Sequence, residues 1–142
     1  MPSPVRETQA MLAGMKPVLS EGAYVFCNVE PRLAKALFEG ATGFFAEAEG
    51  TTLVLHLARA EALGFDTRMP MRRIVLEIYS ALDGVGLTAA VATALANEDI
   101  PCNVIAAFHH DHIFVPENMA EEALAVLRAV QKLAQAKTDS AK

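Results

Sequence analysis

Apolar and polar residues follow two periods along the chain, one typical of helices and one typical of strands. Apolar residues recur at near-helical spacing before Pro17, whereas "AYVFCNV" at 23–29 is short, aromatic and β-branched. In order, the pattern predicts a helix over 5–15, a strand over 23–29, a helix over 31–40, a hairpin with strands at 42–49 and 51–57, and a helix over 58–64.

The pattern then starts again with a clearer periodicity. Ile74, Leu76 and Ile78 share one face of a strand predicted over 72–80. A helix over 85–98, a hairpin with strands at 103–108 and 112–116, a long helix over 117–135 and a frayed polar tail over 136–142 are predicted after it. Asn118 and Glu121 form a capping-box pattern near the start of the long helix.

Both halves therefore predict the same order of elements, βαββα, as a degenerate internal repeat. A ferredoxin-like unit is βαββαβ, so each half lacks its last strand. The strand at 72–80 could complete the first unit while it opens the second, and a partner chain could equally do so. We expect an α+β protein of tandem ferredoxin-like units, with antiparallel sheets and helices on one face. The expected domains are residues 1–70, with a leading helix, and residues 71–142.

Composition restricts the class of protein. A chain of 142 residues with 53% apolar and 20% charged residues can bury a core. The net charge is −5 and the largest basic cluster is the pair Arg72–Arg73, which argues against nucleic-acid binding. No apolar run approaches the ~20 residues that cross a bilayer, and the N-terminus lacks a signal-peptide pattern. We therefore expect a cytoplasmic protein with no membrane partner, in which Cys27 and Cys102 are reduced core residues.

The segment "FHHDHIFVP" at 108–116 holds three of the four histidines. Along an extended strand His110 and His112 would share a face, with His109 and Asp111 on the other. A His-x-His pair supplies only two ligands where zinc needs three or four, and His56, Glu47 and Asp66 are the candidates for further ligands. No nucleophile forms a recognisable motif with these histidines, so we expect neither catalysis nor a cofactor.

The segment "DGVGLT" at 83–88 opens the helix predicted over 85–98. Gly84 and Gly86 permit tight backbone geometry and the close approach of a ligand. The unpaired N–H groups of the first helical turn, together with the helix dipole, suit a carboxylate. The alternative is that Asp83 caps the helix and the glycines only turn the chain.

Residues 82–117, "LDGVGLTAAVATALANEDIPCNVIAAFHHDHIFVPE", resemble the ACT family, a ferredoxin-like module of amino-acid metabolism. The likeness is to the ACT units of aspartate kinases and of the cytosolic arginine sensor, and the whole chain looks like a small bacterial tandem ACT protein. The first half, about 23–70, resembles the fold in pattern more than in motif. The resemblance implies a regulatory protein without catalytic activity that binds an amino acid or similar metabolite where two units meet. It would act as a homodimer or through another protein.

The resemblance also implies which residues bind the ligand. Gly86 would contact the amino acid, Asp111 would hold a cationic side chain, and backbone groups of the preceding strand would assist. The expected set is Asp83, Gly84, Val85, Gly86 and Leu87 from the loop, with Ala107, Phe108 and Asp111 from the hairpin. Two alternatives are a metal-binding protein that uses His109, His110 and His112, and a ligand-free structural dimerisation module. The second alternative predicts that side chains fill the space beside Gly86.

Overall fold

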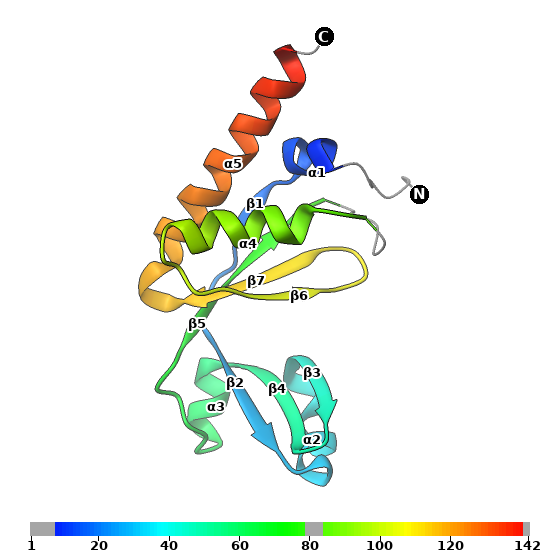
Figure 1. The fold of residues 1–142 in the computed structure, drawn as a ribbon. Helices are drawn as coiled ribbons and strands as arrows, with labels where there is room; N and C mark the ends of the chain where they lie inside the picture. Colours follow the sequence, from blue (N-terminus) through cyan, green and yellow to red (C-terminus); the bar gives the residue numbers. More distant parts are fainter. Residues whose placement is uncertain (1–7, 79–83, 141–142) are drawn as a thin grey trace. The chain divides into compact units, whose positions relative to one another are not determined.

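A computed structural model describes residues 8–78 and 84–140 of the chain (Figure 1). The chain divides into two compact units: a smaller unit, Glu21–Met71, and a larger unit that joins Met1–Ser20 to Arg72–Lys142. No helix among the described residues is long and apolar enough to cross a membrane. The division at residue 70 proposed above stays a prediction, because compact units and evolutionary units need not coincide.

The larger unit contains an antiparallel sheet in the order β1-β5-β7-β6. Its elements are α1 (Thr8–Gly14), β1 (Pro17–Leu19), β5 (Met71–Leu76), α4 (Leu87–Asn97), β6 (Asn103–Ala106), β7 (Asp111–Pro116), the 3₁₀ helix η2 (Glu117–Met119) and α5 (Ala120–Ser140). From β5 to α5 the order is βαββα, as predicted. The last strand of the ferredoxin-like unit is β1, which comes from the N-terminal segment and pairs with β5 from Pro17↔Leu76 to Leu19↔Ile74.

The core of the larger unit lies between one face of this sheet and the helices. Alternate strand residues point into it, and the apolar faces of α1, α4 and α5 cover them. The largest contributors are Met11, Met15, Ile74, Leu76, Leu95, Ile113 and Leu127, each of which is at most 1% exposed. The helices are therefore on one face of the sheet, as expected.

The smaller unit is built on the sheet order β3-β4-β2. Its elements are β2 (Tyr24–Val29), α2 (Pro31–Leu37), the 3₁₀ helix η1 (Phe38–Gly40), β3 (Ala41–Glu47), β4 (Gly50–His56) and α3 (Leu57–Ala62). β3 and β4 form the predicted hairpin, and β2 pairs with β4 from Tyr24↔His56 to Val29↔Thr51. Met71, the first residue of β5, pairs with Tyr24, as expected if the strand after residue 70 completes the first repeat.

Two local expectations were wrong. The tail predicted to fray is helical through Ser140, because alanine, glutamine and lysine favour helix. Asn118 lies inside η2 rather than at the start of α5, so the capping-box pattern does not mark where this helix begins.

The packing of the N-terminal segment can be tested with a buried methionine and an exposed one. Met15 is 0% exposed in the core of the larger unit, and we expect Met15→Ala to lower the free energy of unfolding by about 2–4 kcal/mol. Met69→Ala is the control, because Met69 is 70% exposed and its loss should change stability by less than about 0.5 kcal/mol. Urea denaturation measures both changes. Equal effects would mean that the N-terminal segment is not part of the core.

Candidate functional site

The glycine loop leads directly into α4. Asp83 lies outside the described residues, and the described chain resumes at Gly84. Gly86 is the N-cap of α4 with φ 104°, a left-handed conformation that favours glycine, and no side chain caps the helix there. Its carbonyl accepts the first helical bond, from the Ala90 N–H at 2.9 Å. The backbone donors of the first turn therefore keep the arrangement that suits a carboxylate.

The other loop residues differ in how they could meet a ligand. The side chain of Leu87 is 4% exposed and belongs to the core, so only its backbone can face a ligand. Val85 is 78% exposed, and Gly84 is half-buried. Backbone groups, rather than side chains, are therefore what this loop offers.

The hairpin between β6 and β7 turns over residues 107–110, where the Ala107 N–H donates to the His110 carbonyl at 3.1 Å. Phe108 is 63% exposed, and its ring meets that of His109 edge-on at 5.0 Å between centroids. The Nδ1 atom of His110 lies 3.3 Å from the Ile78 carbonyl oxygen. The turn therefore lies beside the end of β5, the point from which the chain runs on to the glycine loop.

Asp111 is the first residue of β7 and pairs with Ala106. It is 7% exposed and shares a strand face with the core residues Ile113 and Val115. Burial raises the pKa of its carboxyl, and the neighbouring His110 opposes that rise. Because the positive charge of His110 favours the ionised carboxylate, a cationic group brought by a ligand would stabilise that form in the same way.

His112 lies on the opposite face of β7 from Asp111, as the alternation predicted, whereas His109 and His110 lie in the turn and not on the strand. Burial, and then the charges of Arg73 and His110, lower the pKa of His112. Its Nδ1 atom is buried without a hydrogen-bond partner among the described residues. This environment disfavours a protonated imidazole.

Within the part of the chain that the structure describes, no three His, Cys, Asp or Glu side chains are grouped so that they could hold a metal ion. The side chains considered above as further ligands have other neighbours. His56 packs against Tyr24 with 4.6 Å between the ring centroids, Asp66 pairs with Arg68 at 2.8 Å, and Glu47 accepts a hydrogen bond from Thr52. The histidine turn therefore lacks a third ligand among the described residues.

The first residue of α1, which sequence reasoning did not connect with the site, lies against the glycine loop. The Thr8 hydroxyl donates a hydrogen bond to the Val85 carbonyl. A Cβ atom placed on Gly86 would lie 2.6 Å from the Thr8 hydroxyl oxygen and 2.9 Å from its methyl carbon. Thr8 thus fills the space beside Gly86, and no motif signals this because the two residues are far apart in sequence.

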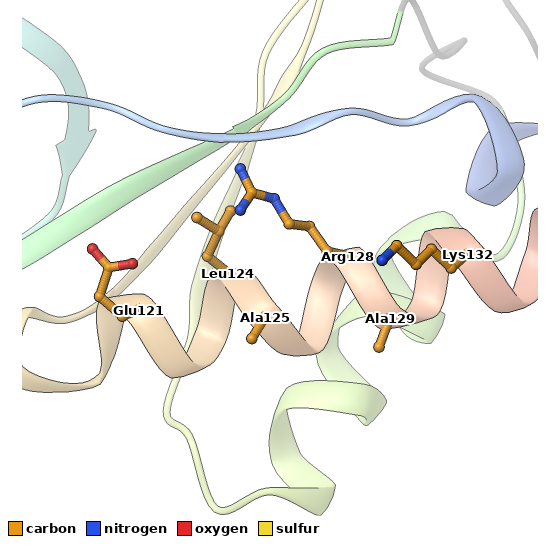
Figure 2. A pocket seen from close by; sticks show the side chains of 6 residues that line it. All are labelled: Glu121, Leu124, Ala125, Arg128, Ala129 and Lys132. Atoms are coloured by element: carbon orange, nitrogen blue, oxygen red, sulfur yellow. The ribbon is translucent and has the colours of Figure 1, made fainter.

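Two surface hollows are found among the described residues. One, of about 390 Å³, follows a single side of α5, and Figure 2 shows Glu121, Leu124, Ala125, Arg128, Ala129 and Lys132 along it. The other, of about 360 Å³, is lined by Val25, Phe26, Asp66, Arg68 and Met69 of the smaller unit. Neither includes the predicted ligand residues. The α5 hollow is bounded by one helix, so it offers no converging polar groups of the kind that orient a small ligand.

Comparisons with known proteins identify the fold. An ACT domain model matches residues 3–72, and a second ACT domain model matches residues 70–129. A Vibrio cholerae protein of unknown function, described as a possible transport protein, is 41% identical, with 87% of this chain and 94% of that chain covered and a TM-score of 0.78. The chain belongs to the ACT domain family and carries two ACT domains in tandem. No curated protein gives a significant match.

More distant solved structures share the fold alone. An Agrobacterium tumefaciens protein is 18% identical, with 82% of this chain and 89% of that chain covered and a TM-score of 0.63. The ligand-free regulatory subunit of aspartate kinase from Thermus thermophilus is 10% identical, with 84% and 97% covered and a TM-score of 0.61. ACT domains are typically regulatory modules that bind amino acids.

The lowered pKa of His112 gives a prediction for the pH dependence of stability. The unfolded chain binds a proton near the ordinary histidine value of 6.5, and the folded protein binds it only at lower pH. The stability that the neutral His112 contributes is therefore fully present above that value and is lost as pH falls through the folded pKa.

We expect the urea midpoint of the wild-type protein to fall between about pH 7.5 and 5, and that of His112→Gln to fall less. His109→Gln, at an exposed turn position, should behave like the wild type. If the urea midpoint changes with pH equally in all three proteins, His112 is not the group that causes the change.

Proposed function

We propose that this protein binds a free amino acid, or a similar small zwitterion, and regulates another protein in response. The observation that carries the proposal is the start of α4 in the second ACT domain. There Gly86 occupies the N-cap position in a left-handed conformation, and no side chain caps the helix. The backbone N–H groups of the first turn are therefore available to a ligand. Regulatory ACT domains support the sensing role, and we propose no catalytic activity for the chain itself.

The proposed ligand residues offer complementary charges. The N-terminal end of α4 favours a carboxylate through its backbone N–H groups and its dipole. Asp111 offers a buried carboxylate to an ammonium or guanidinium group, and the backbone of Ala107 and Phe108 in the exposed turn offers hydrogen bonds. Asp83, Gly84, Val85 and Leu87 stay predicted members of the site. A basic amino acid, which carries two cationic groups, is the ligand class that this arrangement favours.

A ligand-free structural module is the second candidate, and one observation favours it. Thr8 occupies the space beside Gly86, as a module with a filled site requires. The two candidates differ in what added amino acids do to stability. Only a binding protein is stabilised by a small molecule at a fixed protein concentration.

We further propose that the protein is a cytoplasmic homodimer. Within the smaller unit β3 is an edge strand, and it carries Phe44 and Phe45, which are 56% and 71% exposed. Its only charged residue is Glu47, at the end of the strand, so no charge protects its middle against pairing with another strand. A second copy of β3 is the partner that we propose for this edge.

A thermal-shift screen with the twenty amino acids tests the binding function. A ligand at a hundred times its Kd should add roughly 2.7 kcal/mol of stability, which raises the Tm by roughly 5 to 15 °C for a chain of this size. We expect a basic amino acid to give such a rise, and Asp111→Asn to reduce it because the substitution removes the partner of the cationic group. Asp99→Asn is the matched control, because Asp99 is exposed and asparagine tolerates its left-handed backbone, with φ 57°.

Each result of the screen has a distinct meaning. A rise that Asp111→Asn removes and Asp99→Asn preserves supports the proposed site. A rise that both variants preserve means that the amino acid binds elsewhere. No rise with any amino acid favours the structural module. A shift with Zn²⁺ or Ni²⁺ alone favours the metal-binding alternative, so both ions belong in the panel.

Sedimentation velocity tests the proposed dimer edge. We expect the wild-type protein to sediment as a dimer at micromolar concentration, and Phe45→Lys to shift it towards monomer, because a lysine at the strand pairing would have to be desolvated. Leu63→Lys is the control, since Leu63 is an exposed apolar residue, 43% exposed, at the end of α3. A monomeric wild type contradicts the dimer, and a dimer that Phe45→Lys leaves intact contradicts the choice of β3.

A further inference from the structure

The N-terminal helix α1 contacts the glycine loop through its first residue and Ile78, shortly after β5, through its last residue. Thr8, at its start, meets Val85 and Gly86. Gly14, at its end, packs so closely on Ile78 that an added Cβ atom would lie 3.2 Å from the Ile78 Cδ1 atom. Figure 1 shows α1 beside α5 and near the N-terminal end of α4, and both helices contact it. α1 is thus the element positioned to respond to whatever enters the loop.

The two ends of α1 are held by different forces. Met11 and Met15 are 1% and 0% exposed in the core, and the chain then continues into β1, which is paired with β5. At the start of the helix, Thr8 and Gln9 are only half-buried. There the Thr8 hydroxyl bonds to Val85, and the Gln9 side-chain amide donates to the Ala134 carbonyl at 2.9 Å. Neutral hydrogen bonds exchange readily with water, whereas extracting a buried methionine exposes apolar area.

From this difference we infer that the first turn of α1 is a gate on the ligand loop. In the closed state Thr8 holds the space beside Gly86. In the open state Thr8 and Gln9 are withdrawn, while Met11, Met15 and β1 stay in place. The inference rests on the proposed function, because it requires that an amino acid binds at this loop.

A gate of this kind lowers the apparent affinity of the site for its ligand. It also couples ligand binding to a movement of the first turn of α1. Only the open fraction binds, so the apparent Kd equals the intrinsic Kd divided by that fraction. Binding then keeps Thr8 away from Val85 and frees the first turn of α1 for recognition by another protein. The hydroxyl that leaves Val85 and the amide that leaves Ala134 are both rehydrated, which keeps the cost of opening small.

The experiment compares calorimetric titrations of the twenty amino acids into four full-length proteins. The opening variant is Thr8→Ala with Gln9→Ala, which removes the hydrogen bonds from Thr8 to Val85 and from Gln9 to Ala134. The matched control is Thr138→Ala with Gln135→Ala. This control changes the same residue types and removes the Gln135 bond to the Ala13 carbonyl, 3.1 Å long, at the other end of α1. The fourth protein, Thr8→Ser, keeps the hydroxyl and should bind like the wild type.

We expect the opening variant to bind its amino acid roughly 5- to 100-fold more tightly than the wild type, which is the factor that two neutral hydrogen bonds represent. The control should keep the wild-type Kd. Tight binding by the opening variant with none measurable for the wild type also supports the gate.

Other outcomes overturn the proposed gate. Equal affinities for the wild type and the opening variant reject the gate and leave the proposed function standing. An equal gain in the opening variant and the control shows a general loosening of α1, not a gate at Thr8. If no amino acid binds any of the four proteins, the proposed function fails, and the gate fails with it. Should the opening variant not fold, as judged by circular dichroism, Thr8→Ala alone is compared with Thr138→Ala alone under the same criteria.

Discussion

The pairing of β1 with β5 is the constraint on which the rest of the larger unit depends. Without β1, the segment from β5 to α5 would be a βαββα unit with an open sheet edge on β5. Because α1 precedes β1 by only two residues, the register from Pro17↔Leu76 to Leu19↔Ile74 also fixes where α1 lies. Met11 and Met15 then enter the core, and Thr8 reaches the loop before α4.

The proposed ligand site combines two groups of opposite electrostatic character. The start of α4 presents uncapped backbone donors, whereas the turn before β7 leads into Asp111, whose carboxyl pKa is raised by burial. His110 connects this turn to the end of β5 through the Ile78 carbonyl. An ion alone would satisfy one of these groups, and a zwitterion would satisfy both. This complementarity is why we propose a small amino acid, rather than a simple anion or a metal ion, as the ligand.

Most of the fold could be predicted from the sequence, because hydrophobic period and turn residues are local signals. Both hairpins, the helix after Gly86 and the helical face of the sheet follow from them. β1 could not be found this way, since a strand of only three residues that begins with a proline carries no period, and its partner is remote in the sequence. The contact of Thr8 with Gly86 could not be predicted either, because these two residues are also remote from each other in the sequence. For the site, the sequence indicated Gly86 and Asp111 as residues of interest, but the burial of Asp111 and the occupied space beside Gly86 depend on packing that no motif encodes.

The division of the chain also affects the order in which it can fold. The larger unit is made from two stretches that flank the smaller one, so β1 leaves the ribosome well before the strand that it must join. The hairpin, β2 and the two helices of the smaller unit are contiguous, and their contacts can close as soon as residues 21–71 have emerged. Folding of this unit first would shorten the loop that β1 and β5 must close, because a compact body would replace a long flexible connection. The smaller unit would then assist the folding of the larger unit that flanks it in sequence.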